Sequence, residues 1–261
     1  MAEEQLRLGG MALSNGVLVH GPNSWACAIR HPDGRLEVAS ELKRYRSAGV
    51  TNLLFRGPAR LAEALALLPQ VRRRLPEAKL PFQRPRVLTA MLAGAAATQF
   101  ARGSRRVSPA VQELVAAIAS LAPAAIALRS SELAAYHGAE HITIGTYEHG
   151  EAHEKEHERC GSHLIAPLLG TLAIGNALAT RAPAQFRFAA RGLASLGALA
   201  ASTEIFSWMV RNPEHPVSRA LARPGHELQH RLATAEPTPE QLEVAEAALA
   251  ACLELEHGDD S

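Results

Sequence analysis

The segment His137-Gly-Ala-Glu140-His141 has the residue types and spacing of a metal-binding catalytic motif. On a helix, residues i and i+4 share one face, so both imidazole rings can reach one ion. The H-x-x-E-H order is that of inverted zinc peptidases, in which the carboxylate holds a water molecule. The segment therefore predicts a divalent metal site with His137 and His141 as ligands and Glu140 as the catalytic base. It does not identify a substrate.

Three further candidate ligands follow this motif along the chain: Glu148, His157 and Cys160. Glu148 falls nearly in line with the two histidines if the helix continues through the β-branched stretch 142–144, which could also end it early. Glu148 would then come from another element and could still bind the ion. A mixed set of nitrogen, oxygen and sulfur ligands favours Zn²⁺, with Fe²⁺ and Mn²⁺ as alternatives.

Glu204 is a candidate ligand of a different kind, because it is an acid inside an otherwise apolar run. Such an acid is either functional or paired in the interior. It lies well downstream of His141, as expected for the carboxylate that serves as third ligand beside two histidines in an inverted zinc peptidase. The structural alternative is an ion pair with Arg187 or Arg191.

A second histidine motif competes for the metal. His226-Glu227-Leu-Gln-His230 fits the H-E-x-x-H order of ordinary zinc peptidases. Pro224-Gly225 and Glu236-Pro237 are expected to confine its helix to a short segment, where solvent would compete with the ion. We therefore expect the first motif to hold the metal.

The remaining candidates have competing interpretations. His149 and His153 lie among charged residues, as on an exposed helix, where histidine-rich tracts bind metals adventitiously. Cys160 could act as a nucleophile with His157 or His163 as its base. A role for Cys160 as ligand or structural thiol is favoured, since several His and Glu residues surround it in the sequence.

The composition sets the class of protein that must position these residues. The chain has 261 residues and a formal net charge of +1, is rich in Ala and Leu and has few aromatic residues, which favours helices. The arginine clusters lack interleaved aromatic residues, so no nucleic-acid partner is expected. Three widely spaced cysteines indicate a reducing compartment rather than a disulfide scaffold, and the polar start of the chain predicts no secretory signal.

Local patterns predict a mainly α protein with a small N-terminal antiparallel β block, an α+β helical bundle that could be membrane-embedded. Residues 1–50 form the β-hairpin block, in which His31-Pro-Asp-Gly34 is the turn between alternating runs. Residues 51–237 form the helical region with the metal site. Residues 238–261 form an amphipathic helix and a tail, opened by the capping box Thr238-Pro-Glu-Gln241.

Four Ala-rich runs are predicted to form the long helices, and they raise the question of a membrane. The runs are residues 87–101, 109–128, 161–180 and 188–210. Gly161 to Thr180 contains no charged residue and is about as long as a membrane span, which needs about 20 residues. Burial in a soluble bundle is the alternative. Basic residues flank almost every run, so the positive-inside rule gives no clear orientation.

Motifs in chain order resemble the YqhQ-like family. They are Leu8-Gly-Gly-Met11, Asn15-Gly-Val17, Gly21-Pro22, Ala28-Ile-Arg30, Pro32-Asp-Gly34, Tyr136-His-Gly-Ala-Glu-His141, Tyr147-Glu148, His157-Glu-Arg-Cys-Gly161, Arg231-Leu-Ala-Thr-Ala-Glu-Pro237 and Gln241-Leu-Glu-Val-Ala245. The chain departs from the family pattern at Ile142, where the pattern has Lys, and at Ser162-His163, where it has Thr-Ser. The resemblance implies a bacterial domain of unknown function, described as a predicted metal-dependent and usually membrane-bound enzyme.

Together these observations predict a metal-dependent, hydrolytic enzyme with an H-x-x-E-H site, a divalent ion such as Zn²⁺ and an unknown substrate. The resemblance extends the metal site to Glu148, His157 and Cys160. We expect association with a membrane on its cytoplasmic face, with a soluble cytoplasmic protein as the alternative. The competing hypothesis for function is a non-catalytic membrane scaffold with a structural metal or none, in which the β block binds a partner. A structural site is closed, whereas a catalytic site keeps a position for water.

Overall fold

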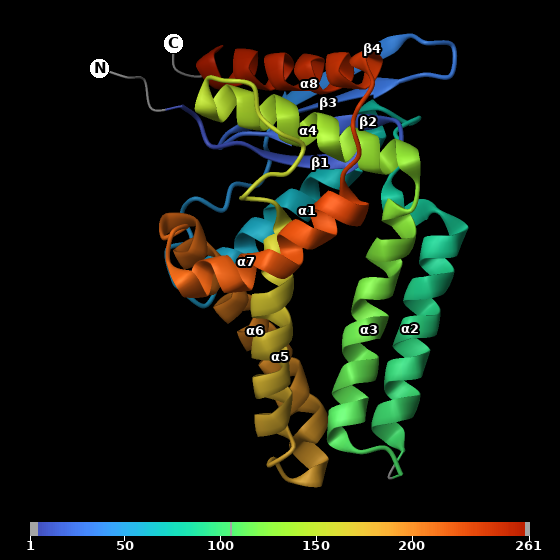
Figure 1. Cartoon of the computed structure of the whole chain (residues 1–261), viewed down its shortest axis with the longest axis vertical. Coiled ribbons are helices and arrows are strands. Elements are labelled where there is room, and N and C mark those ends of the chain that lie inside the picture. Colours follow the sequence, from blue (N-terminus) through green and yellow to red (C-terminus); the bar gives the residue numbers. More distant parts are fainter. Residues whose placement is uncertain (1–4, 105, 259–261) are drawn as a thin grey trace.

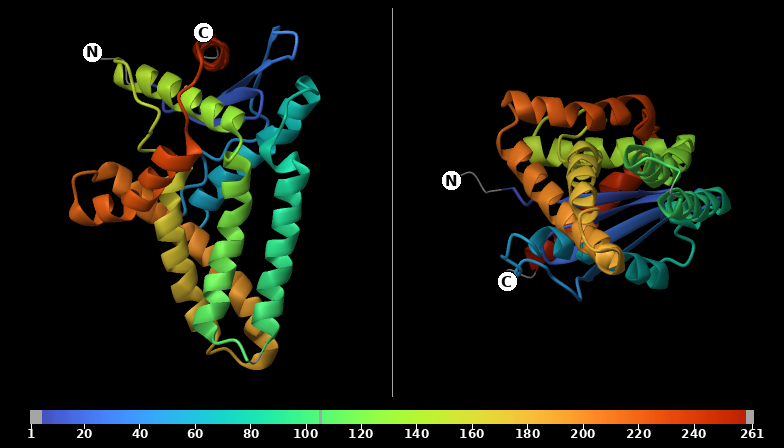
Figure 2. Two further views of the ribbon diagram at one scale, coloured as in Figure 1. Left: turned by 45° about the vertical axis from the view of Figure 1, so that its right-hand side comes forward. Right: turned by 90° about the horizontal axis from the view of Figure 1, so that it is seen from below.

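A computed structural model of the chain describes residues 5–104 and 106–258. It has an upper part, or head, built around a four-stranded sheet, and four long helices that project from it as two hairpins (Figures 1 and 2). This confirms the predicted fold class, mainly α with a small N-terminal antiparallel sheet. Residues 1–4 and the expected tail at 259–261 lie outside the described residues.

The sheet is an antiparallel meander in the order β1-β2-β3-β4. Its strands are β1 (Gly9–Leu13), β2 (Gly16–His20), β3 (Ser24–Arg30) and β4 (Leu36–Leu42). The predicted turn joins β3 to β4, and its Gly34 has a positive φ of 86°, which a residue without Cβ adopts without strain. β1 is an edge strand, which leaves one side of it without a neighbouring strand.

Both faces of this small sheet are covered, which explains why its central strands β2 and β3 are mostly apolar and almost entirely buried. One face packs against α4 (Ser131–His149) and α8 (Pro239–Gly258), forming one of the two core clusters. The other face packs against α1 (Arg56–Arg74), where Trp25 meets Leu67 and Val71 in the second cluster.

The C-terminal helix begins as its sequence predicts. The amide of Thr238 donates to Oε1 of Gln241 at 2.9 Å, and the amide of Gln241 donates to Oγ1 of Thr238 at 3.4 Å. Ala245 and Cys252 of its predicted apolar stripe are fully buried. The helix packs on the sheet, so the segment 238–258 shares a core with the N-terminal strands.

The two projecting hairpins are α2 (Pro85–Gly103) with α3 (Pro109–Leu128), and α5 (Ile165–Ala179) with α6 (Arg187–Arg211). They match the four Ala-rich runs closely, because Ala and Leu favour the helix, and Pro85 and Pro109 stand at the first helical positions of α2 and α3. Short 3₁₀ turns, Pro81–Gln83, Gly161–Leu164 and Ala184–Phe186, precede α2, α5 and α6.

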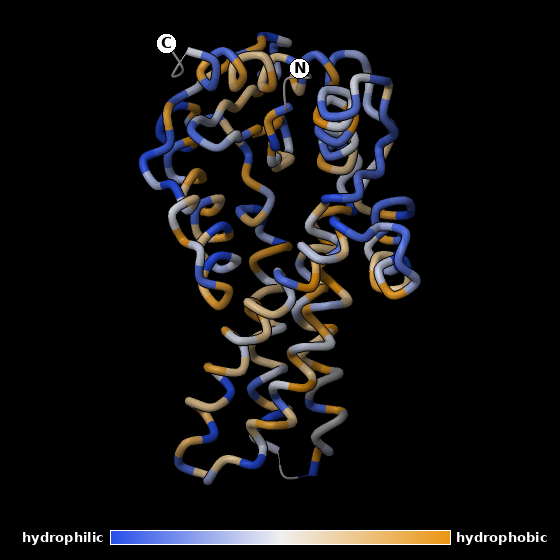
Figure 3. The backbone as a smooth tube through the Cα atoms, turned by 90° about the vertical axis from the view of Figure 1, so that its left-hand side faces the viewer, coloured by the Kyte–Doolittle hydropathy of each residue, from blue (hydrophilic) through white to orange (hydrophobic). Residues whose placement is uncertain are grey.

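Two helical segments, Gly161–Ala179 and Ala184–Arg211, are long and apolar enough to cross a membrane. Large apolar side chains on the hairpins are exposed, most of all Phe100 (81%) and Phe188 (87%). Figure 3 shows that hydrophobic residues predominate along these helices.

The structure decides one open question about helix ends and corrects one expectation. The β-branched stretch 142–144, which could have ended the helix early, does not: α4 continues to His149 and stops at Gly150, in the left-handed conformation with φ 73°. The expectation that Pro224 confines the second motif to a short helix was wrong: α7 (Pro216–Leu228) begins at Pro216 and runs through Pro224, then widens into a π turn, Gln229–Ala233. In both cases tertiary packing overrides a local helix-breaking preference.

Candidate metal centre

The two histidines of the H-x-x-E-H motif lie on α4, one turn apart, with ring centroids 4.3 Å from each other. Nδ1 of His137 lies 2.8 Å from the carbonyl oxygen of Ala233, and Nδ1 of His141 lies 2.6 Å from that of Lys155. A carbonyl only accepts, so both Nδ1 atoms carry the proton and both Nε2 lone pairs are available. This is how ligand histidines are oriented in metal sites.

Cys160 completes a group of three possible ligands. One ligand atom from each of His137, His141 and Cys160 lies within 4.8 Å of the others, and Sγ of Cys160 is 3.7 Å from Nε2 of His137. A common point therefore exists at about 2.8 Å or less from all three atoms, and small rotations would reach zinc bond lengths of about 2.0–2.3 Å. The described donors suit Zn²⁺ in number and type.

Burial favours the form of His141 that a metal site needs. Burial lowers the pKa of His141, although the Cys160 side chain and the carbonyl of Lys155 oppose this, so the ring is neutral near pH 7. A neutral imidazole is the form that binds a metal.

Glu140 lies beside the ligands and in a buried position. Its Oε2 is 3.8 Å from Nε2 of His137 and 3.9 Å from Nε2 of His141. Burial raises the pKa of Glu140, as does Glu148, while His137 and His157 oppose the shift. Gly10 of β1 makes room for this carboxylate, since a Cβ there would lie 2.2 Å from its Oε1.

A buried glutamine holds the loop that carries Cys160. The amide of His157 donates to Oε1 of Gln229 at 2.8 Å, and Nε2 of Gln229 donates to Oγ of Ser162 at 2.8 Å and to the carbonyl of His157 at 3.2 Å. Gln229 is fully buried. The sequence analysis missed this residue and Gly10. Gln229 lies between Glu227 and His230 in the second histidine motif, where the sequence pattern assigns no role to the residue at its position.

Glu148 and His157 lie next to the three-ligand group without being part of it. Oε1 of Glu148 accepts from the amide of Leu8 and pairs with Arg159, and its Oε2 is 3.5 Å from Nε2 of His157. Burial would raise the pKa of Glu148, but His157, Arg159 and the Leu8 amide together lower it below its usual range. Arg159 was another residue that the sequence analysis did not identify.

Glu204 is not brought to this group. It lies on α6 and forms a two-bond ion pair with Arg56 at the start of α1, rather than with Arg187 or Arg191. An arginine distant in the sequence supplies the partner, which the local pattern around Glu204 could not reveal.

The second histidine motif, on α7 and its π turn, does not converge. The rings of His226 and His230 are stacked with centroids 6.4 Å apart. Nδ1 of His230 contacts Oε1 of Glu156 at 2.9 Å, and Glu227 pairs with Arg231 four residues later at 2.8 Å. These are interactions of an exposed helix face, and exposed ion pairs of this kind contribute little to stability.

His163, an alternative base for Cys160, is committed elsewhere. Its Nδ1 bonds the carbonyl of Glu158 at 2.7 Å, and burial lowers the pKa of the ring. The imidazoles beside Cys160 Sγ are those of His137, with Nε2 at 3.7 Å, and of His141. The sulfur thus faces the histidines of the motif.

A cavity of about 500 Å³ opens beside the metal-ligand group. Edge strand β1, α4, the end of α3 and the Cys160 loop surround it. Its walls are mostly apolar, and its polar groups include Glu140, the three ligands and Arg159. A mostly apolar pocket with a few convergent polar groups is the usual form of a small-molecule or active site.

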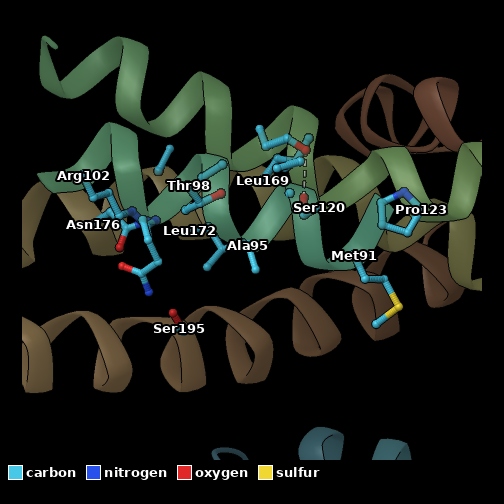
Figure 4. A pocket seen from close by; sticks show the side chains of 16 residues that line it. Met91, Ala95, Thr98, Arg102, Ser120, Pro123, Leu169, Leu172, Asn176 and Ser195 are labelled. Carbon is cyan, nitrogen blue, oxygen red and sulfur yellow. Dashed lines mark hydrogen bonds between the residues drawn. The ribbon is translucent and has the colours of Figure 1, made fainter. Parts of the chain in front are cut away.

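A larger cavity, about 660 Å³, lies among the four projecting helices (Figure 4). Thr98 and Arg102 of α2 and Asn176 of α5 are among its lining residues. Among the described residues that line it, Arg102 is the one ionisable side chain, so the cavity offers no acid–base pair. The described groups that could act as an acid–base pair therefore line the smaller cavity.

Residues 110–255 match a protein family described as Protein of unknown function (DUF1385). The match covers α3 through most of α8, including the whole metal-ligand group. No curated protein and no solved structure matches the chain. Since the match extends over more than half of the chain and agrees with the YqhQ-like motifs, this protein belongs to the DUF1385 family, which is uncharacterised.

Proposed function

We propose that this protein is a membrane-associated, metal-dependent hydrolase with its active site in the 500 Å³ cavity. The observation that carries the proposal is the convergence of His137, His141 and Cys160 to within 4.8 Å of one another. The fixed tautomers of both rings support it, because each Nδ1 is bonded to a carbonyl and each Nε2 faces the group.

Three protein ligands leave a fourth position for water, as in catalytic rather than structural zinc sites. A divalent cation bound here would supply Lewis-acid chemistry, lowering the pKa of water and polarising the bond to be cleaved. Zn²⁺ is the ion we favour for two nitrogen ligands and one sulfur ligand.

Glu140 is proposed as the general base. It is buried, adjacent to both rings and has a raised pKa, so it can accept a proton from a water held in the site and pass it to the leaving group. The apolar cavity walls would exclude other water from the reaction.

Glu148, with its carboxylate held by Arg159 and the Leu8 amide, is proposed to position His157 rather than to bind the ion. Glu204 is not part of the proposed site, since its carboxylate is paired with Arg56.

Membrane insertion of the hairpins is the second part of the proposal. At about 1.5 Å per residue, the 19 residues of Gly161–Ala179 extend about 28 Å, close to the thickness of a bilayer core of about 30 Å, and the 28 residues of Ala184–Arg211 are long enough to cross it at a tilt. Exposed Leu92, Phe100, Phe188 and Leu193 would face lipid, since soluble proteins rarely expose large contiguous apolar surfaces.

We propose that the head lies on the cytoplasmic side. Its three cysteines are free thiols, as expected in a reducing compartment. The active-site cavity would then lie at the membrane surface, because the end of α3 forms part of its wall.

Glu140→Gln tests the catalytic role. We expect the variant to keep its metal but lose about 10²–10⁴-fold in metal-dependent turnover, and to fail to restore the phenotype of a cell that lacks the protein. Activity should also disappear with a chelator and return with Zn²⁺. Full complementation by Glu140→Gln would overturn the enzyme and favour a scaffold with a structural metal.

Membrane fractionation tests the location. The protein should stay in the pellet after washing with high salt and then with carbonate, and require detergent for release. Recovery in the soluble fraction without detergent would reject insertion while leaving the metal proposal intact.

A further inference from the structure

A second group of possible ligands lies at the surface, at the end of α4 and in the loop that follows. One ligand atom from each of His149, His153 and Glu158 lies within 4.8 Å of the others. Nε2 of His149 is 3.6 Å from Oε1 of Glu158, and Nε2 of His153 is 3.8 Å from Oε2. We call these three residues the outer cluster, and His137, His141 and Cys160 the inner cluster.

The outer cluster repeats the ring orientation of the inner one. Nδ1 of His149 lies 2.9 Å from the carbonyl of Gly145, and Nδ1 of His153 lies 2.9 Å from that of Glu154. Both protons are therefore on Nδ1, and both Nε2 lone pairs face Glu158. Gly145 makes this packing possible, because a Cβ there would lie 2.4 Å from Cγ of His153.

A row of imidazoles links the two clusters. Consecutive ring centroids are 4.9 Å apart from His149 to His153, 5.3 Å to His157, 5.5 Å to His141 and 4.3 Å to His137. His157, in the middle, is buried and has the carboxylate of Glu148 3.5 Å from its Nε2. The row thus runs from the surface to the buried centre.

Exposure decreases from the outer cluster as far as His141. The side chain of Glu158 is 53% exposed and that of His149 is 41% exposed, against 18% for His153, 6% for His157 and 3% for His141. The side chain of His137, at the end of the row, lines the cavity and is 18% exposed. The outer cluster is therefore the more exposed of the two to an ion arriving from solvent. An exposed site with three protein ligands binds more weakly than a buried one, since water competes for the ion.

We propose that the outer cluster is a second site for a divalent transition-metal ion, from which the ion reaches the inner cluster along the histidine row. Two imidazoles and one carboxylate suit Zn²⁺ and its neighbours in the first transition row rather than Mg²⁺ or Ca²⁺. The delivery role rests on the proposed metal centre, whereas the outer site itself does not.

The test uses full-length protein in detergent, stripped with a chelator and then given Zn²⁺ in competition with a chromophoric indicator. Wild-type protein should bind two ions, one tightly and one weakly. His149→Ala/His153→Ala should bind only the tight ion, to the same final occupancy, with loading slowed roughly tenfold because the local ion concentration at the entrance falls. His226→Ala/His230→Ala removes two histidines elsewhere and should behave as wild type.

A second double variant separates this proposal from the proposed function. His137→Ala/His141→Ala should lose the tight ion and keep the weak one. If this variant keeps both ions, the inner cluster does not bind metal, and the proposed delivery to it is rejected as well. The outer site is then tested by His149→Ala/His153→Ala alone.

Two results would overturn the proposal directly. Unchanged stoichiometry in His149→Ala/His153→Ala would rule out the outer site. If His149→Ala/His153→Ala loses the weak ion but loads the tight ion at the wild-type rate, the outer cluster is only an adventitious surface site and the delivery role is rejected. Circular dichroism of each variant identifies any that fails to fold, and His149→Gln/His153→Gln then replaces the alanine pair.

Discussion

The histidine pair of α4 and that of α7 have the same i, i+4 spacing and an accompanying glutamate, yet their surroundings differ. On α4, His141 and Glu140 are buried, the rings are 4.3 Å apart and a cysteine from another segment joins them. On α7, the His230 side chain is 63% exposed and Glu227 is paired with its helical neighbour Arg231. Spacing permits shared ligation, but only burial, fixed ring tautomers and a third ligand from elsewhere in the chain make a site.

The strongest test of this contrast compares matched double variants. His137→Ala/His141→Ala should lose essentially all of its tightly bound metal, because two of three protein ligands are gone. His226→Ala/His230→Ala should keep the wild-type content. Elemental analysis of purified, chelator-washed protein measures both, and equal metal in all three proteins would remove the basis for the proposed function.

The support that the α7 segment gives to the α4 site can be tested through Gln229. Its replacement by Ala leaves the amide of His157 and the hydroxyl of Ser162 without their buried partner, so we expect a loss of about 1–3 kcal/mol in the free energy of unfolding. The affinity of the inner cluster for metal should fall about 10–100-fold, as is typical when a residue that holds metal ligands in position is removed. Gln185→Ala, in the exposed 3₁₀ turn before α6, is the control. Normal affinity in Gln229→Ala would show that the Cys160 loop is held by other contacts.

Glu140→Gln should change how the stability of the metal-free protein depends on pH. Burial raises the pKa of Glu140 in the native state above its unfolded value of about 4.3. The native state therefore binds the proton more tightly, and wild-type stability falls as the pH rises from that value through the native pKa. The Gln variant lacks this loss, so its melting temperature should exceed that of wild type increasingly above that pH. Parallel melting curves for the two proteins across pH 4–8 would contradict the buried, pKa-raised carboxylate.

The smallest effect is expected at the corresponding acid of α7. Glu227→Gln removes an exposed i, i+4 ion pair with Arg231, which contributes about 0.3–0.5 kcal/mol. Metal content and turnover should not change. A loss of activity comparable to that of Glu140→Gln would show that Glu227 of α7 also takes part in the reaction, and would contradict a site confined to α4.

Much of the architecture could be predicted from local sequence, because local interactions determine it. The Pro-Asp-Gly turn between β3 and β4, the capping box of α8 and the four Ala-rich helices depend on residues close together in the chain. The expectation of a short α7 was wrong, and local sequence left open whether α4 ends early, since packing holds both helices through unfavourable residues.

The sequence by itself determined that His137, Glu140 and His141 share one helical face, since the helical period imposes it. Only the tertiary structure decided which distant groups join them. Cys160 arrives on a loop held by Gln229, Glu140 fits against Gly10 of the edge strand, and Glu204 is drawn away to Arg56. These contacts join residues far apart in the chain, whose proximity depends on the packing of the sheet and helices rather than on any local pattern.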